Sequence, residues 1–327
     1  MLTDMRGIAI AGSILLDKIH EISVYPKEGE LTKISKMSYA VGGCVPNVAI
    51  DIKVLRNDIP VYAFGKVGND ADGKFVCDTL SNHGIDTEYI RKTDDNTSFT
   101  DVMSVPGGQR TFFTYPGASS DFGFSDIPFD VFEKENIGYL HLGYFLLLDK
   151  IDKGEGALIL KEAEKHGIET SIDLVSENSD RYGLVLPCLP YVDNLIINEV
   201  EAGKLCNIEP CFDNLYDIAL SLKNAGVKKR VIIHMPEVSV CLSESGFTSL
   251  PSFSLPSGFI KGTTGAGDAF CAACILGISE NMSDFDILSF ASCAAVAALS
   301  SPDSVSGMRT EEEVKELCKP FARRNNK

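Results

Sequence analysis

The sequence of 327 residues contains no tryptophan and only five histidines. No histidines form the His-Glu-x-x-His pair used by many zinc hydrolases, so that class of enzyme has little support. Basic residues are also scarce: 30 lysines and arginines face 46 aspartates and glutamates, which gives a formal net charge of −16. A surface with this charge repels nucleic acid and anionic membranes, and neither is expected as a partner.

Long apolar runs are missing as well. The run near the start of the chain is too short for a signal peptide or a membrane span, and no later stretch approaches a spanning helix. The ten cysteines are scattered, as is typical of reduced thiols, and we expect a cytoplasmic protein. Cys271 and Cys274 form a Cys-x-x-Cys pair in an alanine-rich stretch, where close helix packing is a better interpretation than redox or zinc chemistry.

The pattern of apolar residues predicts an α/β fold. A buried first strand is expected at residues 8–12, and from residue 138 onward strand and helix patterns alternate. This alternation is typical of a doubly wound, mostly parallel sheet flanked by helices. Further strands are predicted at 139–142, 169–173, 195–197 and 231–233, and helices at 45–55, 156–166, 266–276 and 287–299.

Two β segments interrupt this alternation in the N-terminal half. Residues 19–25 and 31–40 flank a Pro-Lys-Glu-Gly turn and predict a hairpin. Strand patterns recur at 87–91, 99–105 and 110–115, the last two divided by a Pro-Gly-Gly turn at 106–108. We expect these segments to meet as a small second sheet. It would form a lid from about 18–41 and 92–117, inserted in a single domain that spans residues 1–327.

The strongest local motif is Gly-Thr-Thr-Gly-Ala-Gly-Asp, from Gly262 to Asp268, at the start of an apolar helix. Small residues at a helix start let backbone N–H groups approach an anion, which the helix dipole also favours. A carboxylate beside such an anion site can accept a proton from an attacking hydroxyl. The motif therefore indicates phosphoryl transfer to an alcohol, with Asp268 as the base and the amides of Gly265, Ala266 and Gly267 around the phosphoryl group. The alternative is an ordinary glycine-rich helix start with a capping aspartate.

This motif resembles the C-terminal signature of the ribokinase-like (PfkB) family of carbohydrate kinases. Further elements follow in the family's order: Gly12-Ser13 with Asp17, Gly42-Gly43 with Asn47, Gly65-Lys66-Val67-Gly68, and Asn198-Glu199-Val200-Glu201. The resemblance covers most of the chain and implies the ribokinase-like fold with a small β-sheet lid. It also implies an ATP- and Mg²⁺-dependent kinase that transfers the γ-phosphoryl group to a hydroxyl of a sugar or sugar-like alcohol.

The resemblance assigns roles to individual residues. It implies that Asp17, Gly42, Gly43 and Asn47 bind the acceptor, and that Asn198 and Glu201 order Mg²⁺, largely through water. We expect Asn198, His234 and Thr264 on the nucleotide side, and Arg110 beside a carboxylated sugar or a ring. Taken alone, each residue would more commonly be a cap, a turn or a solvated side chain. A homodimer joined through the lid is a further expectation from the family.

The sequence departs from the family at two places. Gly262 occupies a position where family members often carry an aspartate that helps hold potassium, which argues against activation by a monovalent cation. Pro236 and Ser239 stand where glycines are usual in a loop near the nucleotide, and Glu237 adds negative charge, so weaker ATP binding or another donor is expected.

Two alternatives to a sugar kinase stay open. The first is a nucleoside kinase of the same superfamily, which would share the base and the anion site. The second is a sugar- or nucleotide-binding regulator without turnover. Retention of Asp268 and Glu201 argues against the regulator, because a pure binding protein needs no base.

Overall fold

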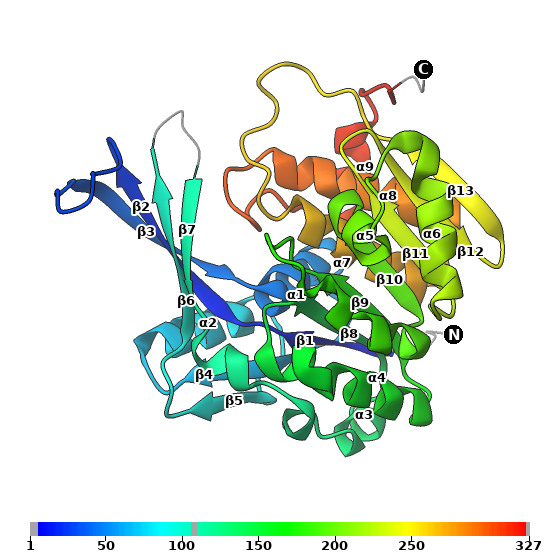
Figure 1. The fold of residues 1–327 in the computed structure, drawn as a ribbon, viewed down its shortest axis with the longest axis horizontal. Helices are drawn as coiled ribbons and strands as arrows, with labels where there is room; N and C mark the ends of the chain where they lie inside the picture. Colours follow the sequence, from blue (N-terminus) through cyan, green and yellow to red (C-terminus); the bar gives the residue numbers. More distant parts are fainter. Residues whose placement is uncertain (1–5, 106–109, 325–327) are drawn as a thin grey trace.

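A nine-stranded sheet forms the centre of the described part of the chain, residues 6–105 and 110–324 of a computed structural model (Figure 1). In spatial order its strands are β13 (Gly246–Pro251), β12 (Val238–Ser243), β11 (Arg230–His234), β10 (Asn194–Asn198), β9 (Glu169–Leu174), β8 (Ile137–Phe145), β1 (Gly7–Gly12), β4 (Val61–Gly68) and β5 (Ile90–Thr93). Neighbouring strands from β11 to β5 are parallel, and β12 and β13 add an antiparallel edge. The predicted mostly parallel α/β sheet is confirmed.

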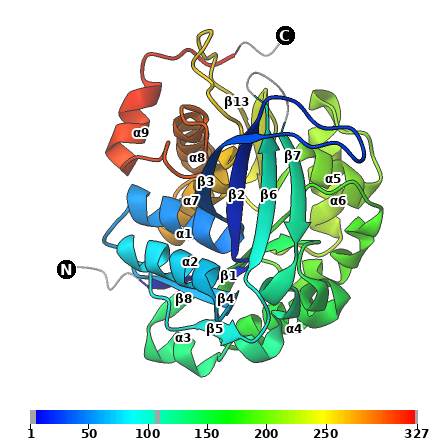
Figure 2. The same cartoon turned by 90° about the vertical axis from the view of Figure 1, so that its left-hand side faces the viewer.

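Helices cover both faces of this sheet and enclose two apolar cores (Figures 1 and 2). One face carries α1 (Cys44–Leu55), α2 (Ala71–Asn82), α7 (Ala266–Ser279), α8 (Asp284–Leu299) and α9 (Glu311–Cys318). The other carries α3 (Asp130–Lys134), α4 (Gly156–Lys165), α5 (Glu199–Cys206) and α6 (Leu215–Asn224). Successive side chains of β1 point to opposite faces of the sheet, so Ile8 and Ile10 pack in the first core and Ala9 and Ala11 in the second.

The predicted helices are present with shifted ends. The helix predicted from residue 287 begins at Asp284, because the Ser283 hydroxyl accepts a hydrogen bond from the amide of Asp286 and caps a polar first turn. Apolar periodicity cannot detect such a turn. Helix α7 runs on to Ser279, and both helices are buried on most sides, which explains their alanine-rich sequences.

A separate four-stranded sheet projects from the end of the large one (Figures 1 and 2). Its order is β3 (Ile34–Gly42), β2 (Leu15–Ile22), β6 (Ser98–Ser104) and β7 (Arg110–Tyr115), with β2 and β6 parallel at its centre. A small second sheet was predicted and is confirmed. The predicted turn at 106–108 lies outside the described residues.

One predicted strand belongs elsewhere. The segment at 87–91 was expected in the small sheet, but β5 lies beside β4 at the edge of the large sheet. Ile90 is the buried residue of β5 and packs in the first core, which accounts for this position. A short edge strand needs no further buried side chain. No helix among the residues that the structure describes has the length and apolar character needed to cross a bilayer.

Candidate active site

The first turn of α7 places Asp268 on the wall of a cavity. The carboxyl group is 7% exposed and lines a cavity of about 200 Å³ with Gly265 and Gly267. Asn47 Nδ2, from α1, donates a hydrogen bond to Oδ2 at 2.9 Å, and the Tyr144 hydroxyl donates to Oδ1 and Oδ2 at 2.9 and 3.0 Å. The predicted base is therefore fixed in direction and borders a space that a substrate can enter.

The surroundings of Asp268 favour its neutral form. Burial and, after it, the nearby Asp173 carboxylate raise the pKa of Asp268, the hydrogen bonds from Asn47 and Tyr144 lower it, and the net pKa is about 7. A carboxyl group with this pKa is ionised in an appreciable fraction of molecules at neutral pH and holds a proton more tightly than an exposed aspartate. Both properties suit a general base.

The glycines before Asp268 lie where an anion site is predicted. Gly265 has φ of 82°, and a Cβ there would lie 2.3 Å from the carbonyl oxygen of Ser304, so only glycine fits. At Gly267 the nearest atom to a Cβ would be His234 Cε1 at 3.7 Å, which leaves the backbone approachable. With Ala266, these residues present N–H groups at the start of a 14-residue helix, a suitable place for phosphate.

His234, at the end of β11, stands between this cavity and a second one. Its ring packs on Phe270 with centroids 4.8 Å apart, and burial lowers its pKa to about 4. The ring is therefore neutral at physiological pH and can offer one donor without adding charge. His234 lines both cavities, as predicted for a residue on the nucleotide side.

The second cavity has a volume of about 470 Å³ and walls that are mainly apolar. Its lining includes Pro236, Phe253, Ile260, Val296 and Leu299. It shares Asn198, His234 and Gly267 with the first cavity, so a ligand in the apolar space can reach the amides before Asp268. These features fit a flat ring with attached phosphates.

The loop that departs from the family borders this apolar cavity. Pro236 lines it, and Ser239 is buried in β12 with its hydroxyl oriented toward the Leu250 carbonyl. The added negative charge is opposed locally, since Glu237 Oε1 lies 3.6 Å from Arg324 Nη1. The Glu237 charge is therefore expected to weaken the binding of ATP less than the sequence predicts.

On the acceptor side, Asp17 projects from β2. Burial raises the pKa of Asp17 to about 7, and the charge of Arg110 lowers it. A Cβ at Gly42 would lie 2.7 Å from Asp17 Oδ2, and one at Gly43, where φ is 89°, would lie 2.6 Å from the Ser13 carbonyl oxygen. The two glycines thus let β3 pass close to this carboxyl group before the chain enters α1 and reaches Asn47.

Arg110, the first residue of β7, connects the small sheet to the loop before α7. Its Nη1 donates to Thr264 Oγ1 at 3.3 Å and its Nη2 to the Pro302 carbonyl at 3.0 Å. Thr264 is exposed and lines neither cavity, whereas its neighbour Thr263 lines the apolar one. A Cβ at Gly262 would lie 2.9 Å from the Ser301 and Pro302 carbonyl oxygens, so an aspartate would not fit there without a backbone shift.

Asn198 and Glu201 form a capping box where β10 passes into α5. Asn198 Oδ1 accepts from the Glu201 amide at 2.9 Å, and Glu201 Oε2 accepts from the Asn198 amide at 3.1 Å. Ser176 Oγ donates to Glu201 Oε1 at 2.7 Å, and burial raises the pKa of Glu201 to about 8. Both side chains line the 200 Å³ cavity, and their oxygen donors fit the preference of Mg²⁺.

Tyr144 and Asp173 were not predicted as site residues. Tyr144 has φ of 59°, at an irregularity in the pairing of β8 with β9, and its amide donates to Asp173 Oδ1 at 2.6 Å. No local motif marks Tyr144. Asp173 could have been found from its place near the C-terminal end of a predicted parallel strand, where sites in such sheets lie.

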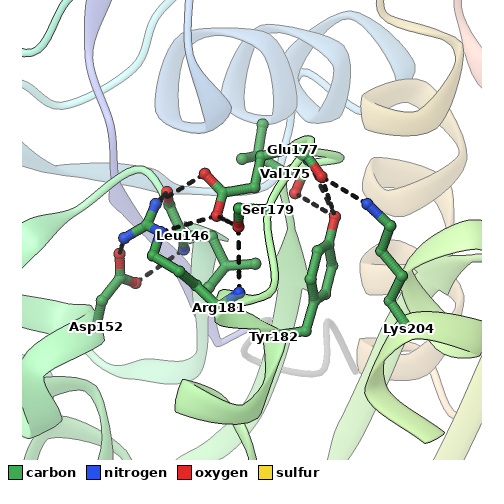
Figure 3. A network of polar contacts seen from close by, with 8 residues as sticks. All are labelled: Leu146, Asp152, Val175, Glu177, Ser179, Arg181, Tyr182 and Lys204. Carbon is green, nitrogen blue, oxygen red and sulfur yellow. Dashed lines mark hydrogen bonds and ion pairs between the residues drawn. The ribbon is translucent and has the colours of Figure 1, made fainter. Parts of the chain in front are cut away.

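A polar network fixes the loop after β9 beneath the cavity (Figure 3). Arg181 Nη2 donates to the Leu146 carbonyl at 2.6 Å and pairs with Glu177 Oε2 at 2.7 Å. Lys204, from α5, donates to the Glu177 carbonyl at 2.7 Å, and the Tyr182 hydroxyl accepts from the Glu177 amide at 3.0 Å. The loops after β8 and β9 are therefore bound to each other and to α5, next to Val175 and Ser176, which line the 200 Å³ cavity.

The chain is similar to known proteins in both sequence and structure. The profile described as pfkB family carbohydrate kinase matches residues 5–311. A ribokinase of Arabidopsis thaliana is 25% identical over 317 residues, which is 95% of this chain and 81% of that protein. An adenosine kinase of Saccharomyces cerevisiae is 26% identical over 264 residues, 77% of this chain and 75% of that protein. The structure of Arabidopsis thaliana ribokinase complexed with ribose and ATP has a TM-score of 0.83 at 24% identity, covering 96% of this chain and 99% of that one. The predicted ribokinase-like fold is confirmed.

Proposed function

Because the chain belongs to the pfkB family of carbohydrate kinases and is thereby a phosphotransferase with an alcohol acceptor, we propose that it transfers the γ-phosphoryl group of ATP to a hydroxyl of a sugar or sugar-like alcohol. One observation carries the proposal: the Asp268 carboxyl group lines the same cavity as Gly265 and Gly267. A hydroxyl placed there meets a proton acceptor and a phosphate site together, as phosphoryl transfer requires.

Each group at the cavity has a defined task. Asp268 accepts the hydroxyl proton, and Asn47 and Tyr144 keep its carboxylate oriented during the transfer. The amides of Gly265, Ala266 and Gly267 stabilise the charge that grows on the phosphoryl oxygens. The apolar cavity takes the nucleotide base, with neutral His234 beside the phosphates.

Asn198 and Glu201 would hold Mg²⁺, largely through water, and the ion would offset phosphate charge when bound. Thr264 lines neither cavity and accepts a hydrogen bond from Arg110. Its contribution on the nucleotide side is therefore to position the loop before α7. The tight packing at Gly262 supports a kinase that does not need a monovalent cation.

The small sheet serves as a lid inserted in one domain and carries half of the acceptor site. Register places Asp17, Thr100 and Thr114 opposite one another on one face, with Arg110 on that same face two pleats further along. Asp17 would accept hydrogen bonds from sugar hydroxyls, together with the backbone at Gly42 and Gly43.

A nucleoside is the second candidate acceptor. Phe112 lies between Arg110 and Thr114 in the period-two pattern of β7, so its ring is on the acceptor face, and it is 56% exposed. An exposed ring there could stack on a base. The yeast adenosine kinase is 26% identical and the Arabidopsis thaliana ribokinase 25%, although the first match covers 77% of this chain and the second 95%.

The Asp268→Asn variant tests the mechanism in an ATP-consumption screen over sugars, sugar acids and nucleosides. We expect loss of nearly all turnover with acceptor binding retained, since asparagine cannot accept the proton. At pH 8 the variant should also gain about 1–3 kcal/mol in free energy of unfolding, because a costly buried charge is removed. Near-normal turnover would contradict the assignment of the base, and activity on nucleosides alone would favour the second candidate.

The opposite face of the small sheet supports a homodimer. Met37 and Tyr39 on β3 and Phe113 and Tyr115 on β7 are each 40–59% exposed on this face. A second copy that covered these side chains would bury apolar surface on both outer strands, on either side of Lys18, His20 and Asp101 of the central strands. Light scattering should give twice the chain mass, and the Phe113→Lys variant should give a monomer. A wild-type monomer at working concentration would contradict the dimer.

A further inference from the structure

Three buried side chains of mixed chemistry meet beside the 200 Å³ cavity, and a fourth lies against one of them. Cys44, His141 and Asp173 place a sulfur, a ring nitrogen and a carboxylate oxygen within 4.8 Å of one another. His141 Nε2 lies 3.5 Å from Asp173 Oδ2 and 3.7 Å from Cys271 Sγ. Residues from α1, β8 and β9 thus converge, and Cys271 of α7 contacts the cluster through His141.

The spacing suits a tetrahedral thiophilic ion. Ligand atoms at about 2.0–2.3 Å from zinc lie roughly 3.3–3.8 Å from each other in a tetrahedral site. Both distances from His141 Nε2 fall in this range. Two sulfurs, one imidazole and one carboxylate form a set that Zn²⁺ accepts and Mg²⁺ does not favour.

The imidazole is already oriented for this role. His141 Nδ1 is 2.8 Å from the Ser171 hydroxyl, which holds the ring and leaves Nε2 directed at the cluster. Gly143 permits the approach, because a Cβ there would lie 1.9 Å from Cys44 Sγ and 2.9 Å from His141 Nε2. The pairing of thiol and imidazole therefore depends on a glycine between His141 and Tyr144.

An ion can reach the cluster through the catalytic cavity. Asp173 and Cys271 both line the 200 Å³ cavity that also borders Asp268. Asp173 Oδ1 accepts from the Tyr144 amide, and the Tyr144 hydroxyl donates to Asp268. An ion held by Asp173 would therefore act on the groups that orient the base.

We propose that Cys44, His141, Asp173 and Cys271 form a binding site for a thiophilic divalent cation of the Zn²⁺ type, separate from Asn198 and Glu201. Binding forms two metal–thiolate bonds, and the two thiol protons pass to solvent. We further infer that the occupied site inhibits the enzyme, a part that rests on the proposed kinase function.

Cadmium titration of the reduced full-length protein tests the site without using activity. One equivalent of Cd²⁺ should produce the ultraviolet absorption of two cadmium–thiolate bonds. Cys44→Ala and Cys271→Ala should each lose about half of this absorption, or all of it if binding fails, whereas Cys211→Ser, at an exposed thiol, should retain it. No absorption at one equivalent, or full absorption in both cluster variants, would overturn the site.

Zinc X-ray absorption on the wild-type protein decides the matter if a cluster variant does not fold. A first shell with two sulfurs supports the site, and a shell of nitrogen and oxygen alone overturns it.

For inhibition, Zn²⁺ should lower turnover at saturating Mg²⁺ and ATP, and a chelator selective for zinc should restore it. Cys44→Ala should need at least ten-fold more Zn²⁺ than Cys211→Ser. If Cys44→Ala and Cys211→Ser are inhibited by the same Zn²⁺ concentration, inhibition does not act through this site. If the wild-type protein shows the cadmium–thiolate absorption but no turnover, the kinase function is refuted and the metal site stands.

Discussion

At the scale of single residues, the carboxyl group of Asp268, the proposed base, has two neighbours that shift its pKa in opposite directions. The Asp173 carboxylate raises the pKa of Asp268 and the Tyr144 hydroxyl lowers it. Asp268 must be deprotonated to accept a proton, so turnover should fall as the pH decreases through about 7, the pKa of Asp268.

This balance gives a paired prediction for the pH profile of kcat. Asp173→Asn removes a negative charge and should move the acidic limb to lower pH, while Tyr144→Phe removes a donor and should move it to higher pH. Each shift should be about 0.5–1 pH unit. The measurement is kcat across pH 5–9 at saturating substrates. If the acidic limb of the kcat profile shifts in the same direction in both variants, it does not report the ionisation of Asp268.

Sequence reasoning located the residues that lie in local motifs and missed those placed by the fold. Asp268, Asn47 and Glu201 could be named as candidates because each stands at a fixed distance from glycines or from a strand end. Tyr144 depends on an irregular pairing of two strands and on a positive φ, neither of which is encoded in a short pattern.

At the scale of elements, the start of α7 is shaped by contact with the loop that follows α8. A Cβ at Gly265 would collide with the backbone of Ser304, whereas one at Gly29 would meet no atom within 4 Å. The two glycines have similar φ, 82° and 78°, so an alanine at either position has the same backbone strain. Comparing the two alanine variants therefore measures the effect of the collision with Ser304 alone.

We therefore expect Gly265→Ala to be much more harmful than Gly29→Ala. The first should lose at least ten-fold in kcat and about 2–4 kcal/mol in free energy of unfolding, since backbone must move at the anion site. The second should lose only about 1 kcal/mol with normal turnover. Denaturant unfolding and steady-state kinetics measure both. Similar losses in the two variants would mean that α7 tolerates the displacement.

The strand at β5 shows where element prediction failed. Its four residues, Ile-Arg-Lys-Thr, contain a single apolar side chain, so the pattern alone could not say which sheet it would join. Its position is set by packing of Ile90 against the first core and by parallel pairing with β4.

At the scale of the whole molecule, Arg110 fastens the small sheet to the body by two hydrogen bonds. Arg110→Ala should raise KM for the acceptor roughly three- to thirty-fold and change kcat less, because the sheet would close less often over bound acceptor. Arg91→Ala, on the edge strand β5, is the matched control and should leave both constants unchanged. A change confined to KM for ATP would contradict this role of Arg110.

In the proposed site, the small sheet would supply part of the acceptor contacts, whereas the proton acceptor and the amides around the phosphoryl group would both belong to α7. Most residues proposed to select the acceptor would thus lie on other elements than the residues proposed to react with it. Substitutions on the projecting strands could redirect the enzyme to a different alcohol during evolution while its chemistry stayed intact.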